Sequence, residues 1–95
     1  MHTIRLDSAV EGDLDDARRK WERVDDAWNT IEWALARDPT IGTPLSESGL
    51  ARSLVVDGSW AHDMPTIQIV YIFEEPYVTI KSVRFSDPAH SAGNA

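Results

Sequence analysis

The stretch IQIVYIFEEPYVTIKSVRF, residues 67–85, decides the fold class of this chain. Residues 67–73 are apolar on both faces and rich in β-branched and aromatic side chains, which is typical of a central strand. Glu74-Glu75-Pro76 then makes a turn, and residues 77–85 form the return strand. The sequence therefore predicts an antiparallel hairpin in the second half of the chain.

Two further strands and two connections are expected outside this hairpin. Residues 50–56 predict a strand with Leu50, Arg52, Leu54 and Val56 on one face. A turn-rich connection, residues 40–49, precedes that strand. A loop with an exposed Trp60 follows it, at residues 57–65. A short alternating strand is also expected at residues 2–6.

The region before the turn-rich connection has helical spacing. Its apolar residues recur at alternating steps of three and four over about three heptads. This seam consists of Leu14, Ala17, Trp21, Val24, Trp28, Ile31 and Leu35. No proline or glycine interrupts residues 13–37, so we expect one long or bent helix that ends before Pro39. The alternative is a helical hairpin that breaks near Val24-Asp25-Asp26, where an aspartate would cap the second helix.

These elements together predict one α+β domain in residues 1–86. An N-terminal strand, the long or bent helix (or helical hairpin) and three further strands would form a helical layer on a mainly antiparallel sheet. A chain of 95 residues leaves no room for a second core. Residues 87–95 are small and polar, which predicts a disordered tail.

The charge balance bears on the class of partner. The net charge is -7, from 9 basic and 16 acidic residues. Proteins that bind nucleic acid usually carry a basic patch, because phosphate neutralisation supplies most of the non-specific affinity. The acidic balance therefore weighs against direct binding of nucleic acid. With no cysteine, neither a disulfide framework nor thiolate chemistry is expected.

The same reading excludes several other classes. No apolar run approaches the roughly 18 residues of a membrane span, and the N-terminus lacks the apolar block of a signal peptide, so we expect a cytoplasmic protein without a membrane partner. The acids at residues 13–16 and 25–26 match the spacing of no calcium loop, and capping of helices explains them better. We expect neither a metal nor a cofactor.

Four motifs, in order and spacing, resemble the RelE/ParE toxin superfamily over roughly residues 27–85. Residues 27–45 resemble the family's second helix and exit turn, with an "I…L…P…G.P" pattern. Arg52 matches the arginine of the following strand, residues 70–73 match a "V.Y" strand, and residues 78–83 match a "V.I..V" strand. The resemblance implies a RelE/ParE-like fold. Family toxins tend to be basic and to have a longer helical region, and this chain departs from both.

The resemblance also implies a function, with alternatives. It implies a toxin-like component of a type II toxin–antitoxin system, of the kind that serves plasmid stabilization and growth inhibition in bacteria. Gyrase-type inhibition through protein–protein contact is favoured over mRNA cleavage, because the sequence lacks a convincing catalytic set. The alternatives are a non-toxic interaction module with the same fold and a ribosome-dependent mRNA endoribonuclease. Whether the chain is an enzyme stays open.

For a ribonuclease, the resemblance implies Arg52, Lys81 and Arg84 as catalytic candidates that would stabilise a cleaving phosphate. Each has a structural interpretation as well. Arg52 would anchor its strand to a helix acid or a carbonyl, and Lys81 and Arg84 would be charges that protect a sheet edge. His62, in the loop, and His90, near the C-terminus, are interpreted as bystanders.

The candidates for partner binding are Trp21, Trp28, Trp33 and Trp60. Aromatic anchors dominate the energetics of many interfaces, and four tryptophans are a large apolar load for so short a chain. The alternative is that Trp21, Trp28 and Trp33 simply cover the sheet. The resemblance implies an antitoxin as partner, with a homodimer as a further association and DNA gyrase or the ribosome as target.

Overall fold

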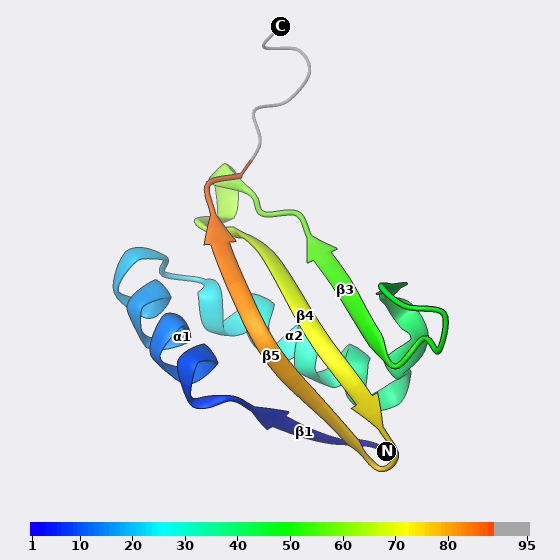
Figure 1. Ribbon diagram of the computed structural model, residues 1–95. Coiled ribbons are helices and arrows are strands. Elements are labelled where there is room, and N and C mark those ends of the chain that lie inside the picture. Colours follow the sequence, from blue (N-terminus) through cyan, green and yellow to red (C-terminus); the bar gives the residue numbers. More distant parts are fainter. Residues whose placement is uncertain (89–95) are drawn as a thin grey trace, which may run out of the picture.

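Two helices and a five-stranded mixed sheet make up the protein, as a computed structural model that describes residues 1–88 shows (Figure 1). The elements are β1 (Thr3–Leu6), α1 (Ser8–Lys20), α2 (Val24–Arg37), the 3-10 helix η1 (Pro39–Ile41), β2 (Thr43–Pro44), β3 (Ala51–Val56), the 3-10 helix η2 (Trp60–His62), β4 (Thr66–Glu74) and β5 (Tyr77–Ser86). The predicted α+β class is confirmed. Most of the predicted tail, residues 89–95, lies outside the described residues.

The sheet has the strand order β1-β5-β4-β3-β2. The predicted hairpin is present as β4 and β5, which pair antiparallel, and β3 pairs antiparallel with β4. Two details differ from the prediction. β1 pairs parallel with β5, which makes the sheet mixed, and four strands rather than three follow the helices. The additional strand, β2, has two residues, and because Pro44 lacks an N–H group it is suited only to a sheet edge.

The helical region is two helices, so the preferred prediction of one long helix is wrong and the alternative of two helices with a break near Val24 is confirmed. The N-cap residue of α2 is Arg23 and not the expected aspartate. α1 ends at Lys20, and Trp21 has an extended backbone, with φ -125° and ψ 118°. Asp63, which lies between η2 and β4, accepts hydrogen bonds from the backbone N–H groups of Glu22 (2.8 Å, through its carboxylate) and Arg23 (3.3 Å, through its carbonyl). A residue far away in sequence therefore satisfies backbone donors of the turn that leads into α2.

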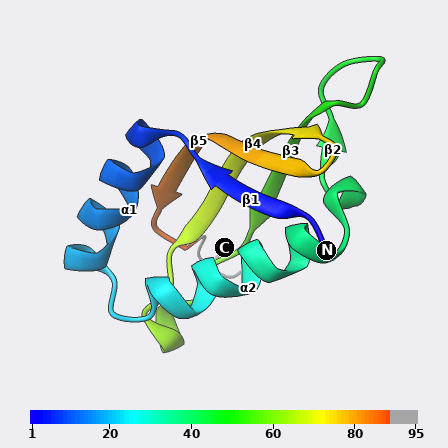
Figure 2. The ribbon, with the colours of Figure 1, turned by 90° about the horizontal axis from the view of Figure 1, so that it is seen from below.

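The apolar seam nevertheless forms the core, as its spacing indicates. All seven seam residues are buried, and they pack with Ile67, Ile69 and Tyr71 of β4 and with Val78 and Ile80 of β5. The steps of three and four continue across the break because α1 and α2 both rest on the same face of the sheet (Figure 2). The tryptophans of the seam, Trp21 and Trp28, thus belong to the core.

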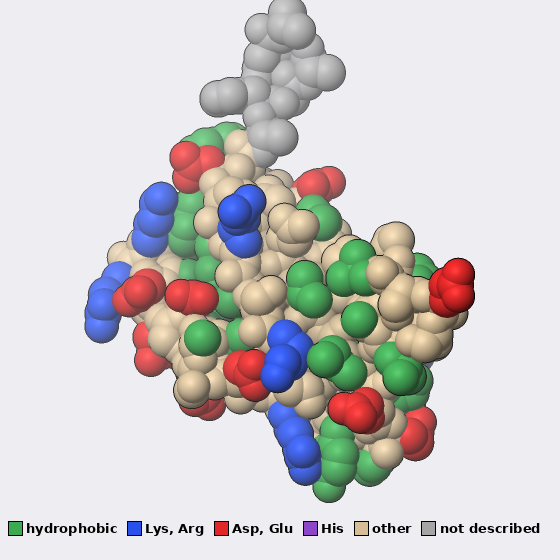
Figure 3. Space-filling model, in the orientation of Figure 1, with side chains coloured by type: hydrophobic (Ala, Val, Ile, Leu, Met, Phe, Trp, Pro, Cys, Tyr) green, Lys and Arg blue, Asp and Glu red, His purple; other side chains and the backbone are tan. Residues whose placement is uncertain are grey.

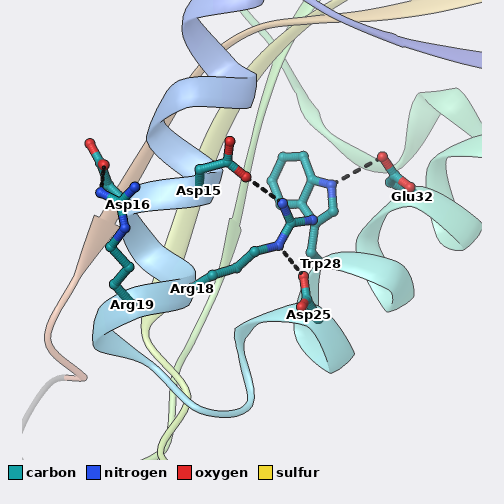
Figure 4. A network of polar contacts seen from close by, with 7 residues as sticks. All are labelled: Asp15, Asp16, Arg18, Arg19, Asp25, Trp28 and Glu32. Carbon is teal, nitrogen blue, oxygen red and sulfur yellow. Dashed lines mark hydrogen bonds and ion pairs between the residues drawn. The ribbon is translucent and has the colours of Figure 1, made fainter.

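Polar contacts join the two helices on their outer side (Figure 4). Arg18 of α1 donates to Asp15 of the same helix at 2.6 Å and to Asp25 of α2 at 2.7 Å. The bond to Asp25 raises the pKa of Arg18. These side chains are about half exposed, so the ion pairs add little to the stability of the fold.

The opposite face of the sheet carries no helix in the part of the chain that the structure describes (Figures 1 and 2). Within residues 1–88, neither helix is long and apolar enough to cross a membrane. The uncovered face is the part of the fold that the helices leave free for contact with another molecule.

Candidate functional site: the uncovered sheet face

Side chains along each strand alternate between the helical layer and the uncovered face. In β4, Ile67, Ile69 and Tyr71 are buried beneath the helices, so Gln68, Val70 and Ile72 point to the other side. The strand register extends this assignment across the sheet. Val55 pairs with Gln68, Ala51 with Ile72, and Arg84 of β5 with Gln68.

An apolar strip runs over β3 and β4 on this face. We define it as Ala51, Val55, Val70 and Ile72, which the register places on neighbouring positions. Val55 is 54% exposed and the other three are half-buried. Hydrophobic side chains gather over these strands in the space-filling view (Figure 3). An exposed apolar strip of this kind is typical of a surface that contacts another protein.

Two arginines flank the strip. The Arg5 guanidinium lies 3.4 Å from the centre of the Tyr77 ring, a cation–π contact. Arg84 borders a hollow of about 440 Å³ with Gln68, Val70 and Ser82. Within residues 1–88, neither arginine forms an ion pair. The uncovered face therefore carries unneutralised positive charge in a chain whose net charge is negative.

Arg52 does not belong to this face. It pairs with Tyr71 and so lies on the side of the helices, where its guanidinium donates to three backbone carbonyls. Nε bonds to Gly49 at 2.9 Å, and one terminal nitrogen bonds to Gly42 at 2.9 Å and to Thr40 at 3.2 Å. The structure thus supports the interpretation of Arg52 as an anchor, and its partners are backbone carbonyls.

Tyr71 holds the same segment from the opposite direction. Its hydroxyl donates to the carbonyl of Pro39 at 2.6 Å and accepts from the N–H of Gly42 at 2.9 Å. Burial raises the pKa of Tyr71, so the phenol stays protonated and able to donate. Asp38 completes the turn by accepting from the Thr40 hydroxyl and N–H, bonds that lower the pKa of Asp38. We call Pro39, Gly42, Arg52 and Tyr71 the exit clamp.

Lys81 does not lie on the uncovered face either. The β4–β5 register shifts at this point, since Val70 pairs with Ser82 and Tyr71 with Ile80, which leaves Lys81 as the additional residue of a β-bulge. Its ammonium lies 3.1 Å from the carboxylate of Asp7, at the start of α1. The three catalytic candidates therefore do not converge: Arg52 faces the helices, Lys81 pairs at the sheet edge, and only Arg84 lies on the uncovered face.

The four tryptophans do not form one surface. Trp21 is 5% exposed and Trp28 2%, so the expectation that they bind a partner is corrected: both rings fill the core. Trp33 and Trp60 are 56% and 53% exposed. Trp33 stacks with Arg37 on the outside of α2, and the Trp60 ring lies 6.0 Å from that of Trp21, between centres.

The two histidines interpreted as bystanders do not lie on the uncovered face within the described residues. The ring of His62 is within hydrogen-bond distance of the Ser59 hydroxyl (3.0 Å from Nδ1), on an exposed loop. His90 lies outside the described residues. Between residues 1 and 88, no group of three His, Cys, Asp or Glu side chains could hold a metal ion.

Sequence reasoning missed Tyr71 and Asp63 as residues that hold the fold together. The "V.Y" motif contains Tyr71, yet only the tertiary structure shows that its hydroxyl reaches Pro39 and Gly42. Asp63 carries no local signal, because its bonds reach the start of α2 from a distant loop. The backbone of Asp63 is left-handed (φ 51°), a conformation that aspartate adopts more often than most residues.

A comparison of the chain with protein-family models, with curated proteins and with solved structures gave no match. What the fold and the surface define on their own is a two-layer α+β protein with one uncovered sheet face. Any narrower assignment rests on the motifs and on the chemistry of that face.

The anchor role of Arg52 makes a testable prediction. We expect Arg52→Met to lower the free energy of unfolding by about 2 kcal/mol, because carbonyls of the exit turn lose a charged donor. Arg84→Met, the matched control on the uncovered face, should change it by less than about 0.5 kcal/mol. Urea unfolding followed by circular dichroism measures both. Equal stability of the two variants would contradict the anchor role.

Proposed function

We propose that this chain is the toxin-like component of a type II toxin–antitoxin system, a bacterial cytoplasmic protein that acts through protein–protein contact. The observation that carries the proposal is the uncovered sheet face with its exposed apolar strip. The order of the four RelE/ParE-like motifs supports the same conclusion. The natural inhibitor would be an antitoxin protein that covers apolar surface of the toxin.

Within this class, gyrase-type inhibition is favoured over mRNA cleavage. A ribonuclease of this type needs several groups around one phosphate, to stabilise charge and to move a proton. The candidates Arg52, Lys81 and Arg84 point to three different places. An inhibitor that works by contact requires no such convergence, only a surface that fits its target.

The test is growth after tightly induced expression of the chain alone in a bacterial host. We expect growth arrest, with DNA synthesis falling before protein synthesis in pulse labelling. Val55→Glu, which places a charge in the apolar strip, should relieve the arrest. Thr30→Glu, on the exposed outer face of α2, is the matched control and should not. Arrest that survives Val55→Glu in a folded protein would contradict the role of the strip.

Normal growth with a folded protein would favour the non-toxic interaction module or a homodimer, which sedimentation distinguishes. One observation keeps the ribonuclease as a second candidate: Arg84 borders a hollow on the uncovered face and forms no ion pair within residues 1–88. For that function, we expect the chain to arrest cell-free translation and Arg84→Ala to abolish the arrest. Unimpaired translation would eliminate it.

A further inference from the structure

The outer edge of β5 is only half covered. β1 pairs with β5 from Tyr77 to Ile80, and β5 continues to Ser86. Beyond Ile80, β4 pairs with one side of β5, and no strand of the described part of the chain pairs with the other. The bulge at Lys81 stands where β1 ends. Residues 82–86 therefore present a free strand edge about 17 Å long, at roughly 3.3 Å per residue.

A furrow of about 330 Å³ lies beside this free edge, between β5 and α1. The apolar residues that line it are Ala17, Trp21, Val83 and Phe85. Hydrophobic side chains are visible between α1 and β5 in the space-filling view (Figure 3). Because Trp21 is 5% exposed and belongs to the core, the floor of the furrow is held in place by the packing beneath it. A preformed apolar floor beside free backbone donors and acceptors suits an extended peptide.

The charges at the rim indicate which peptide fits. Asp13 and Asp16 line the furrow on the side of α1. Within residues 1–88, Asp13 forms no ion pair, and Asp16 contacts Arg19 at 3.1 Å with both side chains largely exposed, a contact of little energetic weight. Lys20, on the same helix, and Arg84 of β5 also line the furrow, and Lys20 is near Asp87 (3.9 Å). The carboxylate of Asp13, which has no ion pair within residues 1–88, and the net charge of -7 both favour a basic occupant.

We propose that an extended, basic segment of a partner protein adds a strand to residues 82–86 of β5. One of its apolar side chains would enter the furrow against Trp21 and Phe85, and a lysine or arginine would reach Asp13 and Asp16. If the partner is the antitoxin, this mode of docking rests on the proposed function. The furrow adjoins the uncovered face, because Val83 and Arg84 line both the furrow and the hollow on that face, whereas the apolar strip on β3 and β4 lies outside the furrow.

A second copy of this chain fits the furrow poorly. Two protomers that paired through their β5 edges would each carry a net charge of -7, and like net charges oppose association. The same net charge disfavours direct binding of RNA or DNA. A basic protein segment is the occupant that satisfies the strand edge, the apolar floor and the rim together.

A random library of displayed 12-residue peptides, selected against the full chain at low salt, provides the probe. We expect enriched peptides to be basic and to alternate apolar and polar residues. With a synthetic peptide of the enriched sequence, amide shifts and slowed hydrogen exchange should map to residues 82–86. Acidic or helical peptides, or shifts that map to β3 instead, would overturn the proposal, as would a library that yields no binder.

Substitutions test the rim. Asp13→Lys should weaken binding of that peptide at least tenfold. Glu11→Lys makes the same charge change on the same helix, but Glu11 lines a different hollow on the other side of α1, so binding should change less than threefold. Both positions are exposed, and circular dichroism verifies that each variant folds. If both variants lost the same peptide affinity, the loss would come from the change in net charge alone. The proposed contact between the peptide and Asp13 would then be wrong.

The growth experiment separates this proposal from the proposed function. Peptide binding at residues 82–86 without growth arrest would retain the docking site and remove the toxin. Growth arrest without peptide binding at residues 82–86 would retain the toxin function and remove the docking site.

Discussion

Trp28→Ala should lower the free energy of unfolding by about 3–5 kcal/mol, a large part of the stability of so small a domain. Trp28 is 2% exposed, and its ring lies 6.2 Å from that of Phe85, between centres. Its Nε1 donates to Glu32 at 3.0 Å, so the polar atom of the buried ring has a partner (Figure 4). Removing the ring would leave a cavity between α2 and the sheet. Urea unfolding followed by far-ultraviolet circular dichroism measures the loss.

Trp33→Ala is the matched control on the same helix. Trp33 is 56% exposed, and its main contact is the Arg37 guanidinium, 4.5 Å from the ring centre. An exposed contact of this kind contributes no more than about 1 kcal/mol. If the two variants were equally destabilised, the assignment of Trp28 to the core and Trp33 to the surface would be wrong.

The contrast between these tryptophans indicates how far the sequence could predict the fold. The steps of three and four selected Trp28 as a core position and placed Trp33 off the seam, because burial on one face requires that spacing whether the helix is continuous or broken. The alternative that Trp33 also covers the sheet is wrong, since its side chain is 56% exposed. The break at Trp21 could not be read from the same pattern. Its stabilising partner, Asp63, lies in a loop whose position depends on the completed sheet.

The candidate site was less predictable than the fold. Basic residues on strands carry no local sign of which way they point, and the β-bulge at Lys81 alters the alternation along β5. The register places Arg52 and Arg84 on opposite faces, which a list of arginines cannot reveal. Two of the residues that define the motifs, Arg52 and Tyr71, are occupied in holding the exit turn. The motifs thus predict the fold better than they predict which residues form a functional site.

Among the residues of the exit clamp, Gly42 should be the most sensitive to substitution. Gly42 is buried, and a Cβ atom there would lie 2.5 Å from the Tyr71 hydroxyl and 2.7 Å from the carbonyl oxygen of Ser53. The φ of Gly42, -76°, is open to any residue, so the cost of a side chain is purely steric. We expect Gly42→Ala to lower the free energy of unfolding by about 3 kcal/mol, measured in urea as above.

Gly12→Ala should have the opposite sign, because nothing lies within 4 Å of a Cβ at this position in α1. Alanine is favoured over glycine in a helix by about 1 kcal/mol, so this control should stabilise the protein.

The double variant Gly42→Ala/Tyr71→Phe then tests the mechanism of the clamp. Tyr71→Phe alone should cost about 2 kcal/mol, because the carbonyl of Pro39 and the N–H of Gly42 lose their partner. It also removes the oxygen that a Cβ at Gly42 would strike. The double variant should therefore cost about 1 kcal/mol less than the sum of the single changes. Strict additivity would mean that the two residues do not meet, and the exit clamp would have to be abandoned.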